Sequence, residues 1–262
     1  MKKFKIGFIG MGNMAKAIAD GLIKAGSVEA SNILAFAPHY EKLEANAREI
    51  GFTPYKDANA LCKDADMVVV ACKPYQIEGV LKTVKTDLKG KALISVAAGW
   101  SYNRFKEILK DDVRIQCIMP NTPAMVAKGV FLFEEENSLT EEEGTYLENI
   151  FESIGLVESL PSRLMEIGAA ITGCGPAFVD LFMEAYADAA VKYGIQRPLA
   201  YKLVGHMVAG SAALMLESGK HPGQLKDEVC SPGGTTIRGV EALEADGLRT
   251  ACIDSVNAVM NK

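Results

Sequence analysis

A short motif near the start of the chain constrains the fold more than any other feature of the sequence. Residues 5–9 form an apolar run, and Gly10-Met11-Gly12-Asn13-Met14-Ala15 follows it directly. In this G-x-G-x-x-A pattern the first glycine permits a tight turn, the second lets a pyrophosphate approach the backbone, and the alanine lets helix and strand pack closely. The following helix presents free N–H groups and its positive dipole end to an anion. The motif predicts a dinucleotide site; a turn that serves packing alone is the alternative.

The first 160 residues alternate between strand and helix patterns. Short apolar runs predict strands at 32–37, 67–72, 92–97 and 114–119, while helical spacing marks 14–25 and 40–50. This alternation predicts βαβ units and a parallel sheet with helices on both faces. A further strand is expected near 128–133. Thr140-Glu141-Glu142-Glu143 reads as a capping box, which we interpret as a solvated helix entrance.

Beyond residue 160 the sequence changes character. Helices are predicted within 164–192 and at 198–218, 235–245 and 248–260, with small and apolar residues on more than one face. Because a helix that is apolar on most faces must be buried on most faces, this part is expected to pack against a second copy of itself. The glycines and proline of Thr172-Gly173-Cys174-Gly175-Pro176 predict a break or kink. His221-Pro222-Gly223 reads as a turn.

The sequence therefore predicts an α/β protein: an N-terminal Rossmann-like doubly wound sheet in residues 1–160, followed by an all-helical dimerisation and substrate-binding domain in residues 161–262. The net charge of −5, without a dense Lys/Arg block, argues against nucleic acid or an anionic membrane as partner. The longest strongly apolar run, 67–72, falls short of the roughly 20 residues of a membrane span. No signal peptide, CxxC pair or metal motif is evident, so a cytoplasmic protein without a metal is expected.

Other strand ends indicate where a dinucleotide would lie. Enzymes that prefer NAD place Asp or Glu at the end of the second strand, where this chain has Ala35-Phe36-Ala37-Pro38. With His39, Lys42 and Lys56 nearby, the missing carboxylate favours NADPH and leaves NADH open. Other strand ends should line the same edge of the sheet, where Asn121 is predicted to bond the nicotinamide carboxamide. The alternative for each of these segments is an ordinary strand-to-helix turn. They read Ala71-Cys72-Lys73-Pro74, Val96-Ala97-Ala98-Gly99 and Met119-Pro120-Asn121-Thr122-Pro123.

A second loop points to a substrate. Ser231-Pro232-Gly233-Gly234-Thr235-Thr236 precedes a predicted helix, so its backbone N–H groups would form a concave site for a small carboxylate. An N-cap with a flexible loop is the alternative. Spacing marks no histidine or lysine as an acid–base group. This favours imine reduction, because a protonated C=N already attracts hydride.

Taken together, the motifs resemble the pyrroline-5-carboxylate reductase family over nearly the whole chain. The likeness rests on IGFIGMGNMAKAIADG, ACKP, SVAAGW, MPNTPA, TGCGPAF and HPGQLKDEVCSPGGTTIRGVEALEADGLR. It implies reduction of 1-pyrroline-5-carboxylate to L-proline, the last step of proline biosynthesis, with NADPH or NADH as hydride donor. It also implies a homodimer with interlocking helical domains, which some members assemble into rings of dimers.

The resemblance assigns roles to individual positions. It implies cofactor contacts at Ile9, Gly10, Met11, Gly12, Asn13, Met14, Ala37, Ala71, Cys72, Lys73, Pro74, Val96, Ala97, Ala98 and Asn121. It implies substrate contacts at Ser231, Gly233, Gly234, Thr235 and Thr236, with Thr236 as the catalytic hydroxyl that bonds the ring nitrogen.

This chain departs from the family pattern at several positions. Cys174 and Cys230 stand where serine is common, Glu228 replaces a neutral polar residue, and Phe36-Ala37 replaces a hydroxyl-bearing pair, which weakens the NADPH preference. Two other functions stay open. One is a related NADP-dependent hydroxy-acid dehydrogenase or F420-type reductase, and the other is a non-catalytic dinucleotide sensor.

Overall fold

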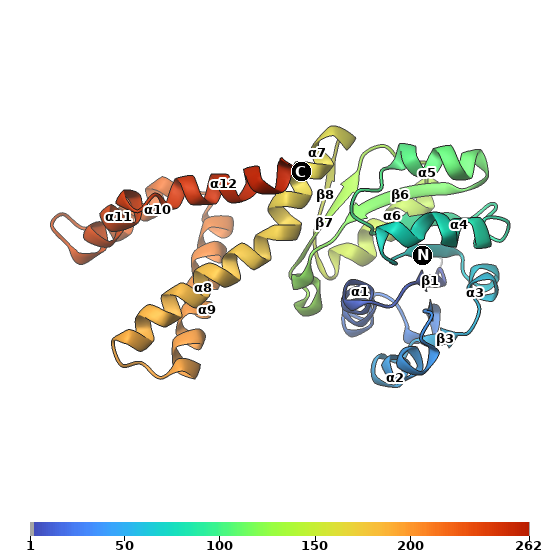
Figure 1. Cartoon of the computed structure of the whole chain (residues 1–262), viewed down its shortest axis with the longest axis horizontal. Coiled ribbons are helices and arrows are strands. Elements are labelled where there is room, and N and C mark those ends of the chain that lie inside the picture. The colour runs from blue at the N-terminus through green and yellow to red at the C-terminus, as the bar shows by residue number, and fades with distance from the viewer. Residues whose placement is uncertain (1–2, 262) are drawn as a thin grey trace. The chain divides into compact units, whose positions relative to one another are not determined.

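A computed structural model describes residues 3–261 of the chain. By its internal contacts the chain divides into two compact units, Met1–Gly173 and Cys174–Lys262 (Figure 1). The domain boundary that the sequence predicts at residue 160 stays a prediction. The helix that follows it, α7 (Ser162–Ala169), contacts the last two strands of the first unit.

From residue 3 onward, the first unit is built on one eight-stranded sheet. Its strand order is β3-β2-β1-β4-β5-β6-β7-β8. Strands β1 to β6 are parallel, β7 runs antiparallel to β6, and β8 runs parallel to β7. The strands are β1 (Ile6–Ile9), β2 (Ile33–Phe36), β3 (Thr53–Tyr55), β4 (Met67–Val70), β5 (Ala92–Ser95), β6 (Arg114–Met119), β7 (Gly129–Glu134) and β8 (Gly155–Leu160). The predicted doubly wound sheet is confirmed, and its order reverses at β1, where such sheets bind ligands.

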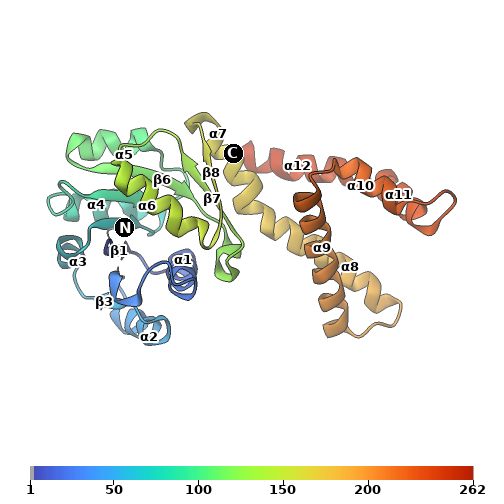
Figure 2. The ribbon, with the colours of Figure 1, turned by 180° about the vertical axis from the view of Figure 1, so that it is seen from behind.

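Helices cover both faces of this sheet, as Figures 1 and 2 show from opposite sides. Helices α1, α2 and α6 contribute to one apolar cluster, and α3, α4 and α5 contribute to the other. In β4, Met67 and Val69 face the first cluster while Val68 and Val70 face the second. A strand buried on both faces reads as a continuous apolar run. The helices are α1 (Asn13–Lys24), α2 (Tyr40–Ile50), α3 (Ala58–Asp64), α4 (Ile77–Val84), α5 (Tyr102–Leu109) and α6 (Glu141–Glu152).

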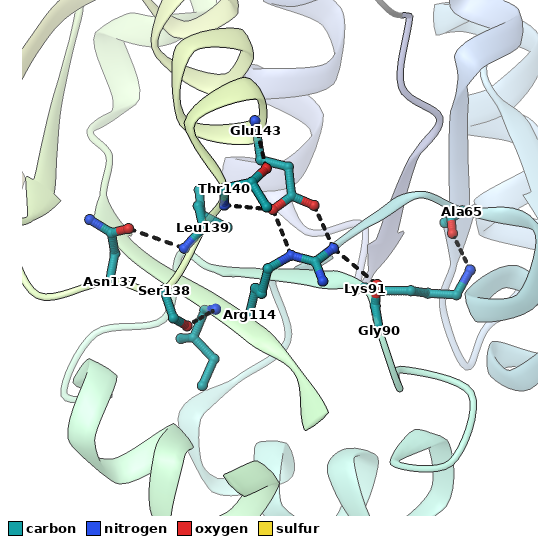
Figure 3. A network of polar contacts seen from close by, with 10 residues as sticks. Ala65, Gly90, Lys91, Arg114, Asn137, Ser138, Leu139, Thr140 and Glu143 are labelled. Atoms are coloured by element: carbon teal, nitrogen blue, oxygen red, sulfur yellow. Dashed lines mark hydrogen bonds and ion pairs between the residues drawn. The ribbon is translucent and has the colours of Figure 1, made fainter. Parts of the chain in front are cut away.

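The helix entrance at Thr140 is not the solvated surface that the sequence predicts. The capping box forms: the Glu143 N–H donates to Thr140 Oγ1 at 3.3 Å, and the Thr140 N–H donates to Glu143 Oε2 at 3.0 Å. Glu143, however, is buried. Arg114 donates from Nε and Nη2 to both carboxylate oxygens, at 2.7 and 2.6 Å (Figure 3). The solvated interpretation is wrong, because Glu143 pairs with Arg114 of strand β6. The local sequence around Thr140 does not reveal this distant partner.

The Arg114–Glu143 pair stabilises the amino ends of the strands. Arg114 begins β6, and its Nη2 also donates to the Gly90 carbonyl, just before β5, at 2.9 Å. Burial raises the pKa of Glu143, but hydrogen bonds from Arg114 and Thr140 outweigh burial and hold that pKa below its usual value. The carboxyl end of the parallel strands, where a ligand is expected, is thus left free of this network.

Up to residue 261, the second unit contains five helices, α8 (Gly175–Lys192), α9 (Arg197–Ser218), α10 (Pro222–Val229), α11 (Thr235–Ala245) and α12 (Leu248–Met260). The predicted break is confirmed, because a π-helical turn, Ala170–Cys174, interrupts the chain before α8. The predicted turn at His221 is wrong. His221 Nδ1 accepts from the Gly223 N–H at 3.0 Å and so caps the start of α10.

Few apolar residues of the second unit are covered within one chain. Its buried cluster consists of Ala187, Ala200 and Val204, with partly buried neighbours around them. In contrast Leu181 is 68% exposed and Leu216 is 76% exposed. By length and composition alone Ser162–Lys192 and Arg197–Ser218 could cross a membrane, a feature that the length of unbroken apolar runs does not reveal. A second copy packed on these helices would cover the same apolar surface.

Candidate active site

The turn after β1 has the backbone that the glycine motif predicts. Gly10 has φ +100°, a value that favours glycine, and its N–H donates to the Phe36 carbonyl at 2.8 Å. A Cβ on Gly10 would lie 2.8 Å from the main-chain carbonyl of Ala71. Gly10 is therefore required by the protein itself, because the end of β4 packs against it.

Gly12 is different, because nothing in the protein requires a glycine there. Its φ of −79° and ψ of −174° suit any residue, and no atom lies within 4 Å of a Cβ built on it. Gly12 is the N-cap of α1, whose first turn has no side-chain cap and no acidic residue. Asn13, Met14 and buried Ala15 follow. This arrangement fits a pyrophosphate, since a Cβ would fill the space in which an anion can approach the helix N–H groups.

The segment between β2 and α2 contains no carboxylate; the nearest acidic residue, Glu41, lies in the first turn of α2. Ala37 is half-buried, and exposed His39 is the N-cap of α2. From the end of β3, Lys56 Nζ lies 4.8 Å from the centre of the Tyr40 ring. Lys42 is exposed on α2. These groups can accept a 2′-phosphate, which the Asp or Glu of NAD-preferring enzymes would repel.

The loops after β4 and β5 lie beside the β1 turn, because β4 pairs with β1 and with β5. The Ala71 N–H donates to the Ile9 carbonyl at 2.9 Å, and the Val96 N–H donates to the Val70 carbonyl at 3.2 Å. The sheet thus brings the predicted cofactor positions of these three loops together. Burial raises the pKa of the Cys72 thiol, so Cys72 is a neutral group at this edge.

Asn121 follows β6 and is committed to contacts within the protein. It is 5% exposed, its Oδ1 accepts from the Val130 N–H at 2.8 Å, and its Nδ2 donates to the Thr172 carbonyl at 2.9 Å. In an α-helix that carbonyl would accept from the residue four positions on, which here is Pro176 and has no N–H. The contact with nicotinamide stays a prediction, for which Asn121 retains its second amide N–H and the second lone pair of Oδ1. Sequence spacing did not reveal this structural role.

The candidate substrate loop is exposed in the second unit. Gly233 has φ +70°, and the Gly234 N–H donates to the Ser231 carbonyl at 3.0 Å. A Cβ on Gly234 would lie 2.5 Å from Ser231 Oγ. Gly234 is the N-cap of α11, without a side-chain cap, and Thr235 and Thr236 are the exposed first residues of that helix. Free N–H groups and two hydroxyls therefore stand at one helix start, where a carboxylate fits.

Three positions that depart from the family pattern have identifiable surroundings. Glu228 lies in α10 and accepts from Lys220 Nζ at 2.8 Å, which holds the pKa of Glu228 below its usual value. Cys174 and Cys230 are half-buried free thiols. Among residues 3–261, no group of three or more His, Cys, Asp or Glu side chains is placed to hold a metal ion.

Comparisons with known proteins agree with this geometry in both halves of the chain. A family model described as pyrroline-5-carboxylate reductase dimerisation matches residues 162–262, and one described as NADP oxidoreductase, coenzyme F420-dependent, matches residues 5–99. The chain is 40% identical to pyrroline-5-carboxylate reductase of Treponema pallidum (strain Nichols) over 260 residues, or 98% of each chain. It is 39% identical to that of Escherichia coli (strain K12) over 259 residues, which cover 98% of this chain and 96% of that protein.

A solved structure gives the same result. The crystal structure of Plasmodium falciparum pyrroline carboxylate reductase with NADP bound matches with a TM-score of 0.90 at 32% identity. The match covers 99% of this chain and 96% of that one. The likeness thus spans the cofactor motif, the helical region and the substrate loop together. The chain belongs to the pyrroline-5-carboxylate reductase family.

Proposed function

We infer that this protein reduces 1-pyrroline-5-carboxylate to L-proline with NADPH, the last step of proline biosynthesis. The observation that carries the inference is the 40% identity to a pyrroline-5-carboxylate reductase over 98% of both chains. That span includes both candidate loops. Shared dinucleotide-binding folds alone would support only a reductase of unstated substrate.

The cofactor fits the carboxyl edge of the first sheet. The bound NADPH supplies the hydride. Gly12 and the N–H groups that open α1 would hold the pyrophosphate, and Lys56 and His39 would hold the 2′-phosphate. NADH can use the same pyrophosphate site, but it gains nothing from the positive charge at Lys56. A preference for NADPH over NADH is therefore proposed.

The chain's own contribution to the reaction is placement and charge. The N–H groups around Gly234–Thr236 bind the substrate carboxylate, and the Thr236 hydroxyl accepts a hydrogen bond from the protonated ring nitrogen. This bond keeps the proton on the imine nitrogen, which makes the adjacent carbon electrophilic. The same hydroxyl can then donate to the amine of proline. Positioning of this kind contributes about 7–11 kcal/mol to catalysis, so no acid–base histidine is required.

The assembly and location are also proposed. Residues 162–262 match a dimerisation domain, so the protein is a homo-oligomer. A homodimer, with rings of dimers as a larger form, would cover exposed leucines such as Leu181 and Leu216. All six cysteines are free thiols, which suits the reducing cytoplasm. Light scattering of the purified protein measures the number of copies.

One assay separates this function from its competitors. Purified protein is tested for proline-dependent reduction of NADP⁺ at high pH, with 3-hydroxyisobutyrate as the alternative substrate and coenzyme F420 as the alternative hydride carrier. Proline-dependent turnover alone is expected. Turnover of the hydroxy acid would support a dehydrogenase. Binding of NADPH with no turnover of any of these substrates would support a sensor.

A further inference from the structure

We propose that Trp100, the single tryptophan of the chain, is a positioning residue that holds two cofactor loops at a fixed separation. The proposal rests on the proposed function, because these loops follow β4 and β5 at the candidate NADPH edge. The two strands are parallel neighbours, with Val70 opposite Ser95 at their ends. Their loops, Ala71–Pro74 and Val96–Ala98, therefore leave the sheet side by side.

The loop after β5 is a tight turn that ends at Trp100. The Trp100 N–H donates to the Ala97 carbonyl at 3.4 Å, and Gly99, the third residue of the turn, has φ +76°. A positive φ at this position is typical of a type II turn. Ser95 Oγ accepts from the Ala97 N–H at 3.3 Å and fixes the start of the turn. The position of Trp100 thus determines where Ala97 and Ala98 lie.

The indole ring connects this turn to the loop after β4. Trp100 Nε1 donates to the Pro74 carbonyl at 3.2 Å. Pro74 begins the short 3-10 helix Pro74–Gln76, and the Lys73 N–H donates to Gln76 Oε1 at 3.1 Å. The accepting carbonyl is therefore fixed within its own loop. One hydrogen bond joins two locally ordered loops whose partners are 26 residues apart in sequence.

Neighbouring side chains prevent the indole from turning away. Trp100 is 5% exposed, and its ring centre lies 4.8 Å from that of Phe105. The Arg104 guanidinium lies over the indole, 3.9 Å from its centre, and Arg104 Nη2 pairs with Glu78 Oε1 of α4 at 3.2 Å. These contacts hold the indole in the orientation that reaches the Pro74 carbonyl.

The consequence concerns cofactor affinity rather than chemistry. Loops that are ordered before binding spare the ligand the entropy cost of ordering them. Trp100 itself is buried and its indole N–H is used by Pro74, so no contact with NADPH is required of it. Loss of the bond should raise the Kd and KM for NADPH, while kcat and the KM for pyrroline-5-carboxylate stay near their normal values.

The test is the Trp100→Phe variant, which keeps an aromatic ring and removes the indole N–H. The Kd for NADPH, measured by calorimetry, should rise about three- to tenfold, as expected for one lost hydrogen bond at roughly tenfold per 1.4 kcal/mol. The matched control is Ile115→Val, in the same apolar cluster but in the amino half of β6, which should lower stability comparably with an unchanged Kd. If Trp100→Phe does not fold, Arg104→Met takes its place, with an expected rise of about twofold or more.

Each outcome decides the proposal. An unchanged Kd in folded Trp100→Phe protein overturns it, and so does an equal rise in Ile115→Val, because that rise would reflect stability alone. An unchanged Kd in Arg104→Met overturns it if that variant has to serve. Failure of the wild-type protein to bind NADPH would instead refute the proposed function.

Discussion

Replacing Gly12 with valine separates cofactor binding from folding. The backbone at Gly12 suits any residue, and a Cβ there meets no protein atom within 4 Å. Valine destabilises the folded protein because glycine is the better N-cap, but it also stabilises it because the unfolded chain loses conformational freedom. These effects oppose each other, so the free energy of unfolding should change by less than about 1 kcal/mol. The added methyl groups would occupy the space next to the N–H groups of Asn13 and Met14.

The loss in affinity follows from the hydrogen bonds that the valine displaces. Two bonds to a charged phosphate, each contributing about 1.5–3 kcal/mol, amount to about 3–6 kcal/mol. At about 1.4 kcal/mol per tenfold, NADPH should bind about 10²- to 10⁴-fold more weakly. Fluorescence titration with NADPH measures the affinity, and urea unfolding measures the stability.

Two other glycine variants serve as controls. Gly10→Ala has a positive φ and a contact of 2.8 Å with the Ala71 carbonyl, so it should destabilise the fold by at least about 1–3 kcal/mol. Gly144→Ala, in open space on α6, should stabilise the protein by about 0.5–1 kcal/mol and leave NADPH affinity unchanged. Normal NADPH affinity in folded Gly12→Val would refute the assignment of the pyrophosphate site.

Three further variants test other parts of the account. Thr236→Ala should lower kcat/KM, with the activation free energy raised by about 2–4 kcal/mol and the NADPH affinity retained. Thr236→Ser should keep most of the activity. Undiminished turnover of the alanine variant would remove Thr236 from the mechanism. Lys56→Met should raise the KM for NADPH about five- to tenfold and leave that for NADH unchanged, and an equal rise for both would contradict the 2′-phosphate assignment. Arg114→Met removes the cationic partner of the buried Glu143 carboxylate, which keeps its bond from the Thr140 N–H, and should cost about 2–3 kcal/mol at pH 7 in urea unfolding. The pKa of Glu143 is lowered in the folded protein, so the stabilisation by the pair is fully present above the unfolded-state pKa of Glu143. It is lost as the pH falls through the folded-state pKa. If the difference in unfolding free energy between wild type and Arg114→Met persists at low pH, this linkage is refuted.

Strands buried on both faces could be predicted from the sequence, whereas the edge strands and the shortest helices could not. β4 reads Met-Val-Val-Val because helices cover both of its faces. β3 has only three residues, one of them proline, and β8 is partly exposed with no clear apolar period. The short helices α3, α4 and α5 span seven or eight residues each, which is too few for a strong periodic signal.

The candidate site divides in the same way between local and long-range features. The β1 turn and the loop before α11 are contiguous motifs, so the amino-acid sequence alone is enough to identify their residues. The hydrogen bonds from Trp100 to Pro74 and from Asn121 to Thr172 join residues 26 and 51 positions apart. Such pairs depend on strand order and on where each loop leaves the sheet, which spacing along the chain does not encode.

The most direct test of the mechanism is a crystal structure of the protein with NADP⁺ and L-proline, or with its ring-oxygen analogue. The account predicts the ligand carboxylate on the backbone N–H groups of Gly234 to Thr236, with the ring heteroatom within hydrogen-bond distance of Thr236 Oγ1. A ring bound anywhere else in the folded protein would contradict it.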